Sequence, residues 1–557
     1  MARDYSNYSK DALIAYIHEI EKQLKNNKYG LYWDKSIETE TVVNQCKTNI
    51  PILKREQESC IFENENADTH ILIEGDNFHA LTAMNMMCGN EGFVDVIYID
   101  PPYNTGSKDF IYNDSFVEKE DGYRHSKWLE FMHQRLELSR KLLKEDGIVF
   151  ISIDDYEFAQ LKLLCDAIFG DKRFINMFIW QRNSSGKTEK EKFTVNTEYV
   201  LLYSKSEKYC LYPAYKPLSE NTRKMYSKDD HDGRGKYRLY PLQKPKDPGP
   251  ETTYDYIDNT GKIWECPAKG WRIKQSKMKA LENDGRLCFD NKALSEKAYW
   301  NERKSEGKRI DTMWNDLSEN SVGSKELESV IGRKNSFDNP KPRDLIKRCL
   351  QISNKEAVIL DFFAGSGTTG QAVLELNKED GGNRKCILCT NNEGNICTDV
   401  TYPRLKTVIT GKRQDGSEYS EGIPANLMYY KTDFIEDSRN TDQAKYSLVE
   451  KVDELLCIIE ETYVCKGRTE HYSHYQSFDG NRNTFIYSDY YSEEPFKEFE
   501  ELIRNTDGKK IVYVFSTDNT FDEKLLEGIE GITTKPIPSK IYEIYKEIVE
   551  DIKRGEQ

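Results

Sequence analysis

The sequence predicts an α/β protein whose core is a parallel, doubly wound β-sheet. Apolar, β-branched runs recur along the chain, and segments of helical character follow them. Several of these runs end in an acidic residue or a glycine-rich turn, at the carboxyl end where strands of an open sheet bind ligands. Two strand–helix units in series lead to this prediction: Val94–Tyr103 with Ser126–Lys144, and Ile148–Ile153 with Glu157–Phe169.

The first segment with a clear pattern, Ser9–Lys25, is expected to form a helix. Leu13, Ile17, Ile20 and Leu24 fall on one face of it. Such a face packs either on a partner helix or on its own domain. Residues 34–68 are polar and have no clear assignment.

The segment Val94–Tyr103 (VDVIYIDPPY) joins a buried-strand pattern to a stiff polar loop. Pro101 and Pro102 fix φ and remove two backbone donors. The loop presents the Asp100 carboxylate, backbone carbonyls and the Tyr103 ring. Because carboxylate and carbonyl oxygens accept hydrogen bonds from an amino group while a ring stacks on a base, these four residues are candidate catalytic residues. The alternative is an ordinary proline-rich turn.

The elements around this loop continue the strand–helix pattern. Asp76 follows a strand, where it either binds an amino or hydroxyl group of a ligand or caps the next helix. Asn104–Phe116 is expected to be a mobile loop near the site, and Ser126–Lys144 an amphipathic helix. Phe174–Trp180 and Glu198–Tyr203 are expected to form the last strand pair of this half.

Residues 205–335 differ from the flanking sequence. They are rich in Tyr, Lys, Arg, Gly and Pro and lack clean periodicity. Aromatic and cationic residues gather there, a mixture that suits phosphates and base edges but equally a small domain anchored by tryptophan. The residues concerned are Trp264, Trp271, Arg272, Lys274, Lys277 and Lys279.

A second candidate site follows in the strand Ala357–Phe363, which contains Asp361. It runs into the turn Ala364-Gly365-Ser366-Gly367, and helix Asp344–Cys349 precedes it. Glycines at a strand-to-helix turn let backbone approach a ligand, and the helix N-terminus attracts an anion. The turn lacks both G-x-G-x-x-G and G-K-[ST], so neither NAD nor ATP is favoured.

The next strand, Lys385–Cys389, contains one C-x-x-C pair. With no second pair nearby, Cys386 and Cys389 are expected to be buried structural residues rather than zinc ligands. An acid after the second strand of such a unit typically binds ribose hydroxyls, and Glu393 is the best candidate. It otherwise caps a helix or lies in a solvated loop. No metal site is expected.

Composition narrows the class of protein. The 557 residues carry a net charge of −15, yet residues 201–350 hold 31 Lys and Arg against 23 Asp and Glu, a local charge of +8. A basic middle in an acidic chain fits a phosphate-binding surface. No apolar run is long enough to span a membrane, and no secretory signal is visible. Thirteen scattered cysteines indicate reduced thiols, and hence a cytoplasmic protein.

Two motifs make a family resemblance specific. IDPPYNTG (99–106) and DFFAGSGTT (361–369) look like the motif pair of S-adenosylmethionine-dependent DNA amino-methyltransferases. Their order, with a basic region between them, resembles the β group, whose sheet is circularly permuted. Further stretches resemble the modification (Mod) subunit of type III restriction-modification systems, over roughly the first three-quarters of the chain. They are KYGLYW, LIEGDNFHAL, GIVFISIDDYEFAQLKLL, NPKPRDLIKRCL and CTNNEGNICTDVTYPRL.

The resemblance implies roles for matching residues. Asp100, Pro101, Pro102 and Tyr103 would hold and stack the target adenine. The implied cofactor-binding residues are Asp76 at the adenine end, Glu393 at the ribose, Lys341 and Pro342 beside the methionine part, and Asp361, Phe363, Ala364, Gly365, Ser366 and Gly367 in the pocket. Trp271, Arg272, Lys274 and Lys277 would contact DNA.

It also implies a domain organisation. Five segments are expected: 1–35, N-terminal and helical; 36–204, the catalytic half of the methyltransferase domain; 205–335, a target-recognition domain; 336–430, the cofactor-binding half; and 431–557, a small α/β domain for assembly or DNA contact. In the last segment, a helix through Leu448–Ile459, a strand Lys509–Phe515 and a final helix Ile541–Ile552 are expected.

The chemistry of such a reaction fits these residues. An exocyclic amino nitrogen is a poor nucleophile, and accepting its two hydrogens at Asp100 and Pro101 would aim its lone pair at the activated methyl group. In-line transfer then needs no covalent intermediate, and positioning supplies most of the acceleration. The base would have to flip out of the duplex, with Tyr103 replacing lost stacking.

Three functions therefore stay open. The first is an adenine-N6 DNA methyltransferase. The second is a cytosine-N4 enzyme, which shares the fold but more often has Ser in place of Asp100. The third is a DNA-recognition subunit that binds cofactor without transferring a methyl group. Expected partners are double-stranded DNA, a second copy of the chain and a restriction (Res) subunit, with no membrane.

Overall fold

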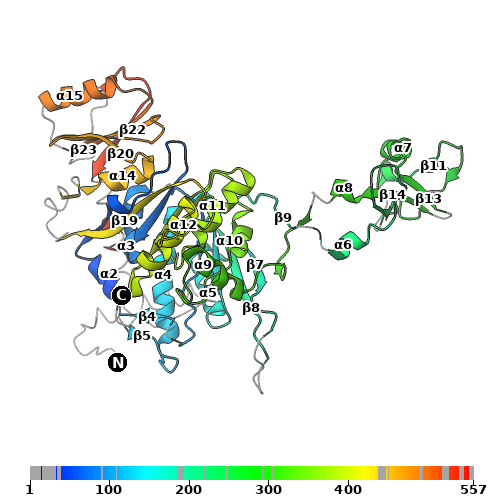
Figure 1. Cartoon of the computed structure of the whole chain (residues 1–557), viewed down its shortest axis with the longest axis horizontal. Helices are drawn as coiled ribbons and strands as arrows, with labels where there is room; N and C mark the ends of the chain where they lie inside the picture. The colour runs from blue at the N-terminus through cyan, green and yellow to red at the C-terminus, as the bar shows by residue number, and fades with distance from the viewer. Residues whose placement is uncertain are drawn as a thin grey trace. The chain divides into compact units, whose positions relative to one another are not determined.

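The computed structural model divides into two compact units (Figure 1). The larger unit comprises residues 1–212 and 312–557, and the small unit comprises residues 213–311. The structure describes residues 10, 14, 33, 39–88, 92–107, 109–113, 115–185, 193–216, 218, 220–244, 249–290, 293–303, 307–436, 447–448, 451–488, 493–516, 526–538, 545–547 and 549–550.

A mixed β-sheet forms the centre of the larger unit. Among the described residues it has ten strands. In spatial order they are β1 (Ile50–Arg55), β19 (Asn426–Ile435), β2 (Thr69–Glu74), β18 (Lys385–Thr390), β17 (Val358–Asp361), β3 (Val94–Ile99), β6 (Leu143–Ile153), β8 (Thr197–Ser204), β7 (Phe174–Gln181) and β16 (Met313–Trp314). The six strands from β19 to β6 run parallel, which confirms the predicted core. The edge pairs β1–β19, β6–β8 and β8–β7 are antiparallel, so the sheet is not parallel throughout.

The order of the strands is permuted relative to the chain. β17 and β18, from the second half of the sequence, lie between β2 and β3, from the first half. The residues of β3, β17 and β18 are almost all buried, because helices cover both faces of the sheet. Strands buried on both faces are continuous apolar runs, and for this reason the sequence predicted them correctly.

Helices of the larger unit pack against one another in two groups. In one group α4 (Arg124–Leu142) contacts α3 (Asn77–Cys88) and α5 (Phe158–Phe169). In the other group α11 (Thr368–Asp380) contacts α10 (Arg343–Leu350) and α12 (Tyr402–Thr410), and α12 also contacts α9 (Asn320–Ile331). After the Asp100–Tyr103 loop, a short hairpin forms from β4 (Ile111–Tyr112) and β5 (Ser115–Phe116).

The small unit has a core of its own. An antiparallel sheet orders β10 (Tyr237–Pro241), β14 (Ala293–Tyr299) and β13 (Leu287–Asp290), with α7 (Gln275–Asn283) and the hairpin of β11 (Tyr256–Ile257) and β12 (Ile263–Trp264) beside them. Shorter elements are β9 (Tyr215–Lys216), α6 (Glu220–Lys224), α8 (Trp300–Arg303) and β15 (Lys308–Arg309). The unit is smaller than the expected domain 205–335, because β16 joins the central sheet and α9 packs on α12.

The C-terminal residues pack against the central sheet. The expected boundary between 430 and 431 falls inside β19, and α14 (Asp453–Glu460) packs on α3 and β1. A five-stranded sheet follows, with α15 (Glu493–Arg504) inserted before its fourth strand. Its strands are β20 (Val464–Arg468), β21 (Tyr472–Gln476), β22 (Arg482–Tyr487), β23 (Lys509–Ser516) and β24 (Ile532–Pro538).

Two expected helices lie largely outside the described residues. Only residues 10 and 14 of Ser9–Lys25 are described, and both are helical. Of Ile541–Ile552, residues 545–547 and 549–550 are described, also as helix. Within the described part of the chain, no helix is both long and apolar enough to cross a membrane.

Candidate functional site

The two sequence motifs meet at the carboxyl edge of the sheet. β17 and β3 are parallel neighbours, with Ile359 opposite Val96 and Leu360 opposite Ile97. Because both strands end at the same edge, the Asp100–Tyr103 loop and the glycine turn leave the sheet beside each other. The two motifs, more than 250 residues apart, therefore form one site.

The Asp100 carboxylate is partly buried, and both of its oxygens accept hydrogen bonds. Lys341 Nζ donates to Oδ2 at 2.9 Å, and the Tyr103 hydroxyl donates to Oδ1 at 2.8 Å. Burial raises the pKa of Asp100 above its usual range, and the ammonium of Lys341 partly offsets this rise.

A second carboxylate, Glu198 of β8, completes this polar cluster. It accepts from the Tyr103 hydroxyl at 3.2 Å and from Arg182 Nη1 at 2.9 Å, and Lys341 Nζ lies 3.5 Å from its Oε2. Burial opposes the charge of Glu198, but Lys341 and Arg182 together hold its pKa below the usual value. Burial likewise opposes the charge of Lys341, and Asp100 and Glu198 nevertheless raise its pKa.

Side chains behind the Asp100–Tyr103 loop fix its shape. Trp128 Nε1 donates to the Pro102 carbonyl at 2.6 Å. Asn104 has a left-handed φ of 57°, and its Nδ2 donates to Glu157 Oε1 at 2.6 Å and to the Arg124 carbonyl at 3.2 Å. An unusual backbone conformation thus persists next to Tyr103 because buried partners hold it.

The glycine turn requires its glycines. Gly365 and Gly367 have φ values of 48° and 75°, a region that disfavours side chains. A Cβ at Gly365 would lie 2.9 Å from the Phe337 ring. Gly367 directly precedes α11, so the free N–H groups of that helix begin at the turn.

Two of the residues expected in the cofactor pocket are buried beneath the turn. Asp361 accepts from the Phe363 N–H at 3.0 Å and from the Thr369 hydroxyl, and burial raises its pKa to about 7. Ser366 is 3% exposed, and its carbonyl accepts from Arg404 Nη1 at 3.2 Å. The Asp361 and Ser366 side chains therefore hold the turn from within, and their expected cofactor contacts stay a prediction.

The other expected cofactor residues surround the turn. Ala364 is buried, and Phe363 is half-buried, with its ring centroid 5.9 Å from that of Phe131. Pro342 directly precedes α10. Glu393 is exposed and follows β18, the neighbour of β17.

Asp76 has the capping role that the sequence left open. Its Oδ1 accepts from the Phe78 N–H at 2.7 Å, and the buried Arg135 lies 3.6 Å away. Arg135 also bonds Asn77, whose Nδ2 donates to the Phe362 carbonyl at 2.9 Å. The chain after β2 is thereby tied to the chain after β17.

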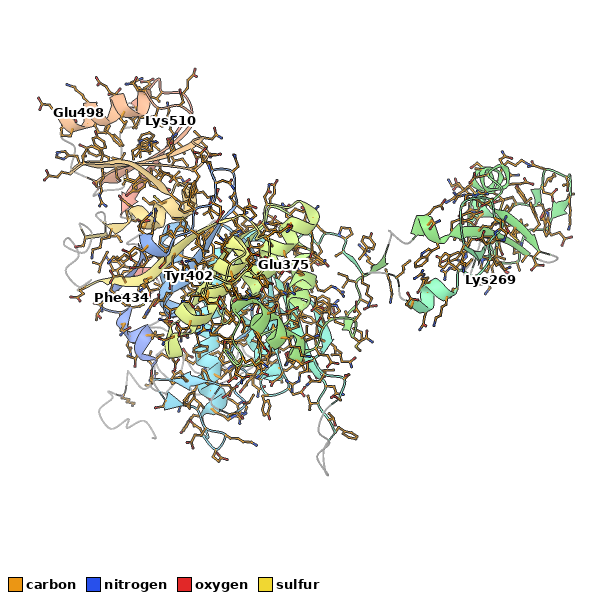
Figure 2. The ribbon with its side chains drawn as sticks, viewed as in Figure 1. Lys269, Glu375, Tyr402, Phe434, Glu498 and Lys510 are labelled. Carbon is orange, nitrogen blue, oxygen red and sulfur yellow. The ribbon has the colours of Figure 1, made fainter. Side chains whose placement is uncertain are left out.

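In the small unit, burial corrects one expected DNA contact. Trp271 is 3% exposed, lies in the core and donates from Nε1 to the Tyr254 carbonyl at 2.7 Å, so it cannot meet a base edge. Arg272, Lys274 and Lys277 are exposed, as is Lys269 (Figure 2). Lys274 pairs with Glu251 at 2.6 Å.

Sequence reasoning missed several buried charged residues. All of the following ionisable residues support the site: the buried Glu198, Arg135, Arg404 and Glu157, and the half-buried Arg182. A signal existed for Glu198, because it is a charge at the start of the apolar segment EYVLLY, where an unpaired charge would be costly. Side-chain partners that lie more than 90 residues away in the sequence could not be predicted from any local pattern. Cys386 and Cys389 are buried in β18 as expected, and no group of His, Cys, Asp and Glu in the described residues could hold a metal ion.

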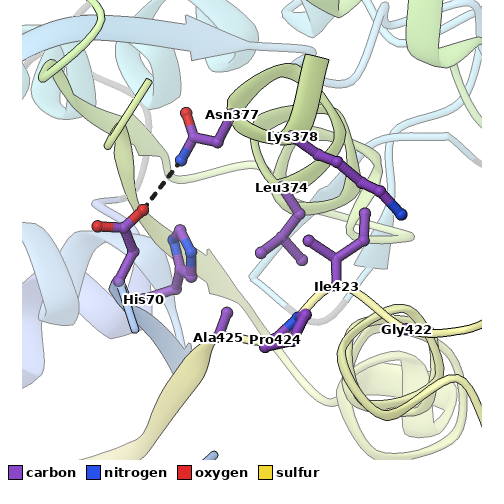
Figure 3. A pocket seen from close by; sticks show the side chains of 9 residues that line it. His70, Leu374, Asn377, Lys378, Gly422, Ile423, Pro424 and Ala425 are labelled. Atoms are coloured by element: carbon purple, nitrogen blue, oxygen red, sulfur yellow. Dashed lines mark hydrogen bonds between the residues drawn. The ribbon is translucent and has the colours of Figure 1, made fainter. Parts of the chain in front are cut away.

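A separate cavity of about 280 Å³ lies at the opposite edge of the sheet (Figure 3). Asp68, His70 and Ala425 line it where β2 and β19 begin, and Asn377 Nδ2 donates to Asp68 at 3.3 Å. Since Asp100 follows the carboxyl end of β3, this cavity is not part of the candidate site.

The fold and the site identify the family. A model of the DNA methylase family (N6_N4_Mtase) matches residues 94–400, just over half of the chain, and the chain belongs to this family. The match begins at β3 and ends beyond β18, so it contains both motifs of the site.

Relatives agree with this assignment. The chain is 35% identical over 354 residues to the StyLTI Mod subunit, a type III restriction-modification enzyme subunit of Salmonella typhimurium, covering 58% of this chain and 53% of that one. It is 34% identical to the type II methyltransferase M.KpnI of Klebsiella pneumoniae, covering 56% and 78%. The chain thus spans about half the length of the StyLTI subunit. The M1.HpyAVI–SAM complex covers 60% of this chain and 98% of that one, with 14% identity and a TM-score of 0.28.

Proposed function

We propose that this protein is a site-specific DNA methyltransferase that transfers a methyl group from S-adenosylmethionine to the N6 amino group of a flipped-out adenine. The observation that leads to this proposal is the junction of an Asp-Pro-Pro-Tyr loop and a glycine turn on adjacent parallel strands. We further propose that it is the modification subunit of a type III-like system, because the StyLTI Mod subunit is among its relatives.

The residues at the turn fit the proposed cofactor. Gly365 and Gly367 hold positive φ values, and a Cβ there would press on Phe337 and Thr401, so the turn keeps a bare backbone that a ligand could approach. The N-terminus of α11 suits the carboxylate of a methionine group. Phe363 offers an apolar side, and Asp76 and Glu393 follow the neighbouring strands, where ribose hydroxyls and an adenine would lie. When bound, S-adenosylmethionine supplies an activated methyl group.

The chain's own residues would orient the acceptor. Asp100 and the Pro101 carbonyl accept the two amino hydrogens, which directs the nitrogen lone pair toward the methyl group. Tyr103 stacks on the flipped base. Because the loop is rigid and held by Trp128 and Asn104, the base arrives in a fixed orientation, and this positioning supplies much of the acceleration.

Asp100 favours adenine over cytosine as the target, since cytosine-N4 enzymes more often have Ser at this position. We propose that double-stranded DNA contacts the small unit through Arg272, Lys274 and Lys277. A second copy of this chain and a restriction (Res) subunit are the proposed protein partners, and the cytoplasm is the proposed location.

The decisive experiment measures transfer of labelled methyl from S-adenosylmethionine into DNA, followed by nucleoside analysis. N6-methyladenine supports the proposal, N4-methylcytosine supports the alternative enzyme, and no transfer supports a non-catalytic recognition subunit. Asp100→Ala is expected to abolish transfer while calorimetry shows unchanged cofactor affinity.

The matched control for Asp100 is Asp166 of α5. It too accepts from a tyrosine hydroxyl (Tyr203, 2.8 Å) and a lysine (Lys162, 2.7 Å), but it lies away from the carboxyl edge. Asp166→Ala is expected to keep transfer. Substantial transfer by Asp100→Ala would contradict the role assigned to Asp100.

A further inference from the structure

Lys341 contacts the two groups that the proposed function reserves for the target base. Its ammonium donates to Asp100 Oδ2 at 2.9 Å and lies 4.8 Å from the centroid of the Tyr103 ring. An amino group hydrogen-bonded to this carboxylate above this ring would occupy the same place. The Lys341 side chain is only 7% exposed, so its position is enclosed by the protein.

A second position for the ammonium exists beside the first. Glu198 Oε2 lies 3.5 Å from Lys341 Nζ, and the Glu198 side chain is 3% exposed. Arg182 holds the other oxygen of Glu198 at 2.9 Å, which fixes the carboxylate. The Tyr103 hydroxyl already bonds both carboxylates. A short movement of one lysine side chain would therefore exchange one carboxylate partner for the other.

We propose that Lys341 is a placeholder for the target amino group: it binds Asp100 and covers Tyr103 before the base enters, and it moves onto Glu198 when the base takes its place. The proposal rests on the proposed function and adds two positioning residues, Lys341 and Glu198, to it. Neither has to touch the reacting atoms.

Electrostatics favours this exchange over expulsion of the lysine. A buried ammonium without a partner is strongly unfavourable, and so is a buried carboxylate. With Glu198 beside it, the ammonium keeps a carboxylate throughout, while the amino group of the base replaces it at Asp100. Two carboxylates and two cations, Lys341 and Arg182, keep the cluster balanced in both arrangements.

The placeholder also keeps Asp100 ionised. Burial raises the pKa of Asp100, and Lys341 opposes this rise. Without the ammonium the carboxyl group would hold its proton to higher pH, and a protonated acid is a poorer acceptor for an amino group. The ionisable groups around the pair are Tyr98, Tyr103, Asp154, Arg182, Glu198 and Asp361.

The test compares Lys341→Met with Glu198→Gln in the full chain. The probe is 9-methyladenine, titrated with S-adenosylhomocysteine present, and 9-methylhypoxanthine, which lacks the amino group, is the reference. The preference for the adenine is the ratio of the affinity for 9-methyladenine to that for 9-methylhypoxanthine. At pH 9, Lys341→Met is expected to raise this ratio by about threefold or more, because the variant has no ammonium that the amino group must displace. Glu198→Gln is expected to lower it by a similar factor, because the lysine has lost its second position.

Matched controls come from similar clusters elsewhere. Lys162 pairs with Asp166 and lies 4.4 Å from the Phe174 ring centroid, and Glu460 accepts from Tyr513 and Lys535. Lys162→Met and Glu460→Gln are expected to leave the adenine preference unchanged. Cofactor affinity of all four variants shows whether a change is confined to the base position.

Opposite effects of the two site variants support the placeholder, and a purely structural role would not produce them. A second readout is the pH profile of single-turnover methyl transfer, whose acidic limb should move to higher pH in Lys341→Met. Equal losses in both variants, or an unmoved pH profile, would overturn the placeholder. Absence of methyl transfer by the unmodified chain would overturn the proposed function, and the free-base titration would still decide the placeholder.

Discussion

At the scale of single residues, Glu157 is a buried acid that the fold keeps protonated. Its side chain is fully buried, and burial raises its pKa to about 8. Burial also lowers the pKa of His125, whose Nδ1 lies 2.6 Å from Glu157 Oε1. At pH 7 the pair is therefore a neutral hydrogen bond between Glu157 Oε1 and His125 Nδ1, and not an ion pair. It anchors Asn104, next to Tyr103.

This assignment predicts how stability depends on pH. Unfolded Glu157 loses its proton near pH 4.5 and folded Glu157 near pH 8, so the unfolded state binds fewer protons between these values and stability falls as pH rises. Glu157→Gln cannot ionise, so its free energy of unfolding should lack this decrease with pH. The difference in free energy of unfolding between the variant and the parent is therefore expected to shift in favour of the variant by on the order of 3 kcal/mol between pH 5 and pH 8. Calorimetric unfolding at several pH values measures this; parallel curves for both proteins would refute the assignment.

Tyr103 combines two roles that substitution can separate. Its ring is proposed to stack on the flipped base, and its hydroxyl bonds Asp100 and Glu198. Tyr103→Ala is expected to weaken binding of target DNA by about 1–3 kcal/mol through lost stacking, whereas Tyr103→Phe keeps the ring and loses only the hydroxyl contacts. Fluorescence of 2-aminopurine at the target position measures base flipping. Equal binding by the parent and Tyr103→Ala would discard the stacking role.

The residues predicted from the sequence were those in contiguous motifs. Asp100–Tyr103 and Gly365–Gly367 are each a few neighbours along the chain, and their chemistry is local. The partnership of Lys341 with Asp100 and Glu198 depends on how the segment before α10 meets the end of β3 and the start of β8, which no local pattern encodes. Trp271 was assigned to the surface because composition alone cannot distinguish an aromatic core residue from an aromatic contact.

At the scale of elements, α11 has a glycine in the left-handed region at each end. Gly367 precedes its first residue with φ 75°, and Gly381 follows its last with φ 67°. A Cβ at Gly381 would meet nothing within 4 Å, whereas Gly367 belongs to the proposed cofactor turn. Gly381 therefore serves as a control for Gly367 within the same helix.

Alanine at either glycine should lower stability, and more so at Gly367, where a Cβ would lie 3.1 Å from Thr401 Cγ2. Each substitution places a side chain at positive φ, which costs about 1 kcal/mol. Only Gly367→Ala is expected to weaken S-adenosylmethionine binding, by about tenfold or more, because only this turn is proposed to contact the cofactor. Calorimetric titration and thermal unfolding separate the two effects. An equal loss of cofactor affinity in Gly381→Ala would mean that helix stability, and not the turn, determines binding.

The burial and the position of each strand explain whether it could be predicted from the sequence. β3, β17 and β18 are apolar in most of their residues because both faces are buried, and each precedes a polar loop. β1 was missed because it lies in a polar stretch and contains Pro51, and it pairs only as an edge strand, on β19. The boundary placed at 430 cut through β19, since the strand continues into three polar residues, Lys431, Thr432 and Asp433, which resemble a surface segment.

At the scale of the whole molecule, the two units differ in net charge. Residues 213–311 hold 22 Lys and Arg against 16 Asp and Glu, a net charge of +6 in a chain of −15. Phosphate contacts release counterions, so affinity for DNA should fall steeply with salt if this unit binds the backbone. The acidic remainder would repel DNA elsewhere and favour this unit as the point of contact.

Replacing Arg272 and Lys277 with Gln tests this division. Each lost phosphate contact reduces the slope of log affinity against log salt by about 0.9, so the double variant is expected to bind DNA more weakly with a slope smaller by about 1.8. Cofactor affinity should not change, because both residues belong to the small unit. The control replaces Lys466 and Lys509, exposed lysines of the C-terminal sheet, with Gln. If the control lowers the salt slope as much as the double variant does, DNA binds the C-terminal sheet as well, and the small unit is not the main point of contact.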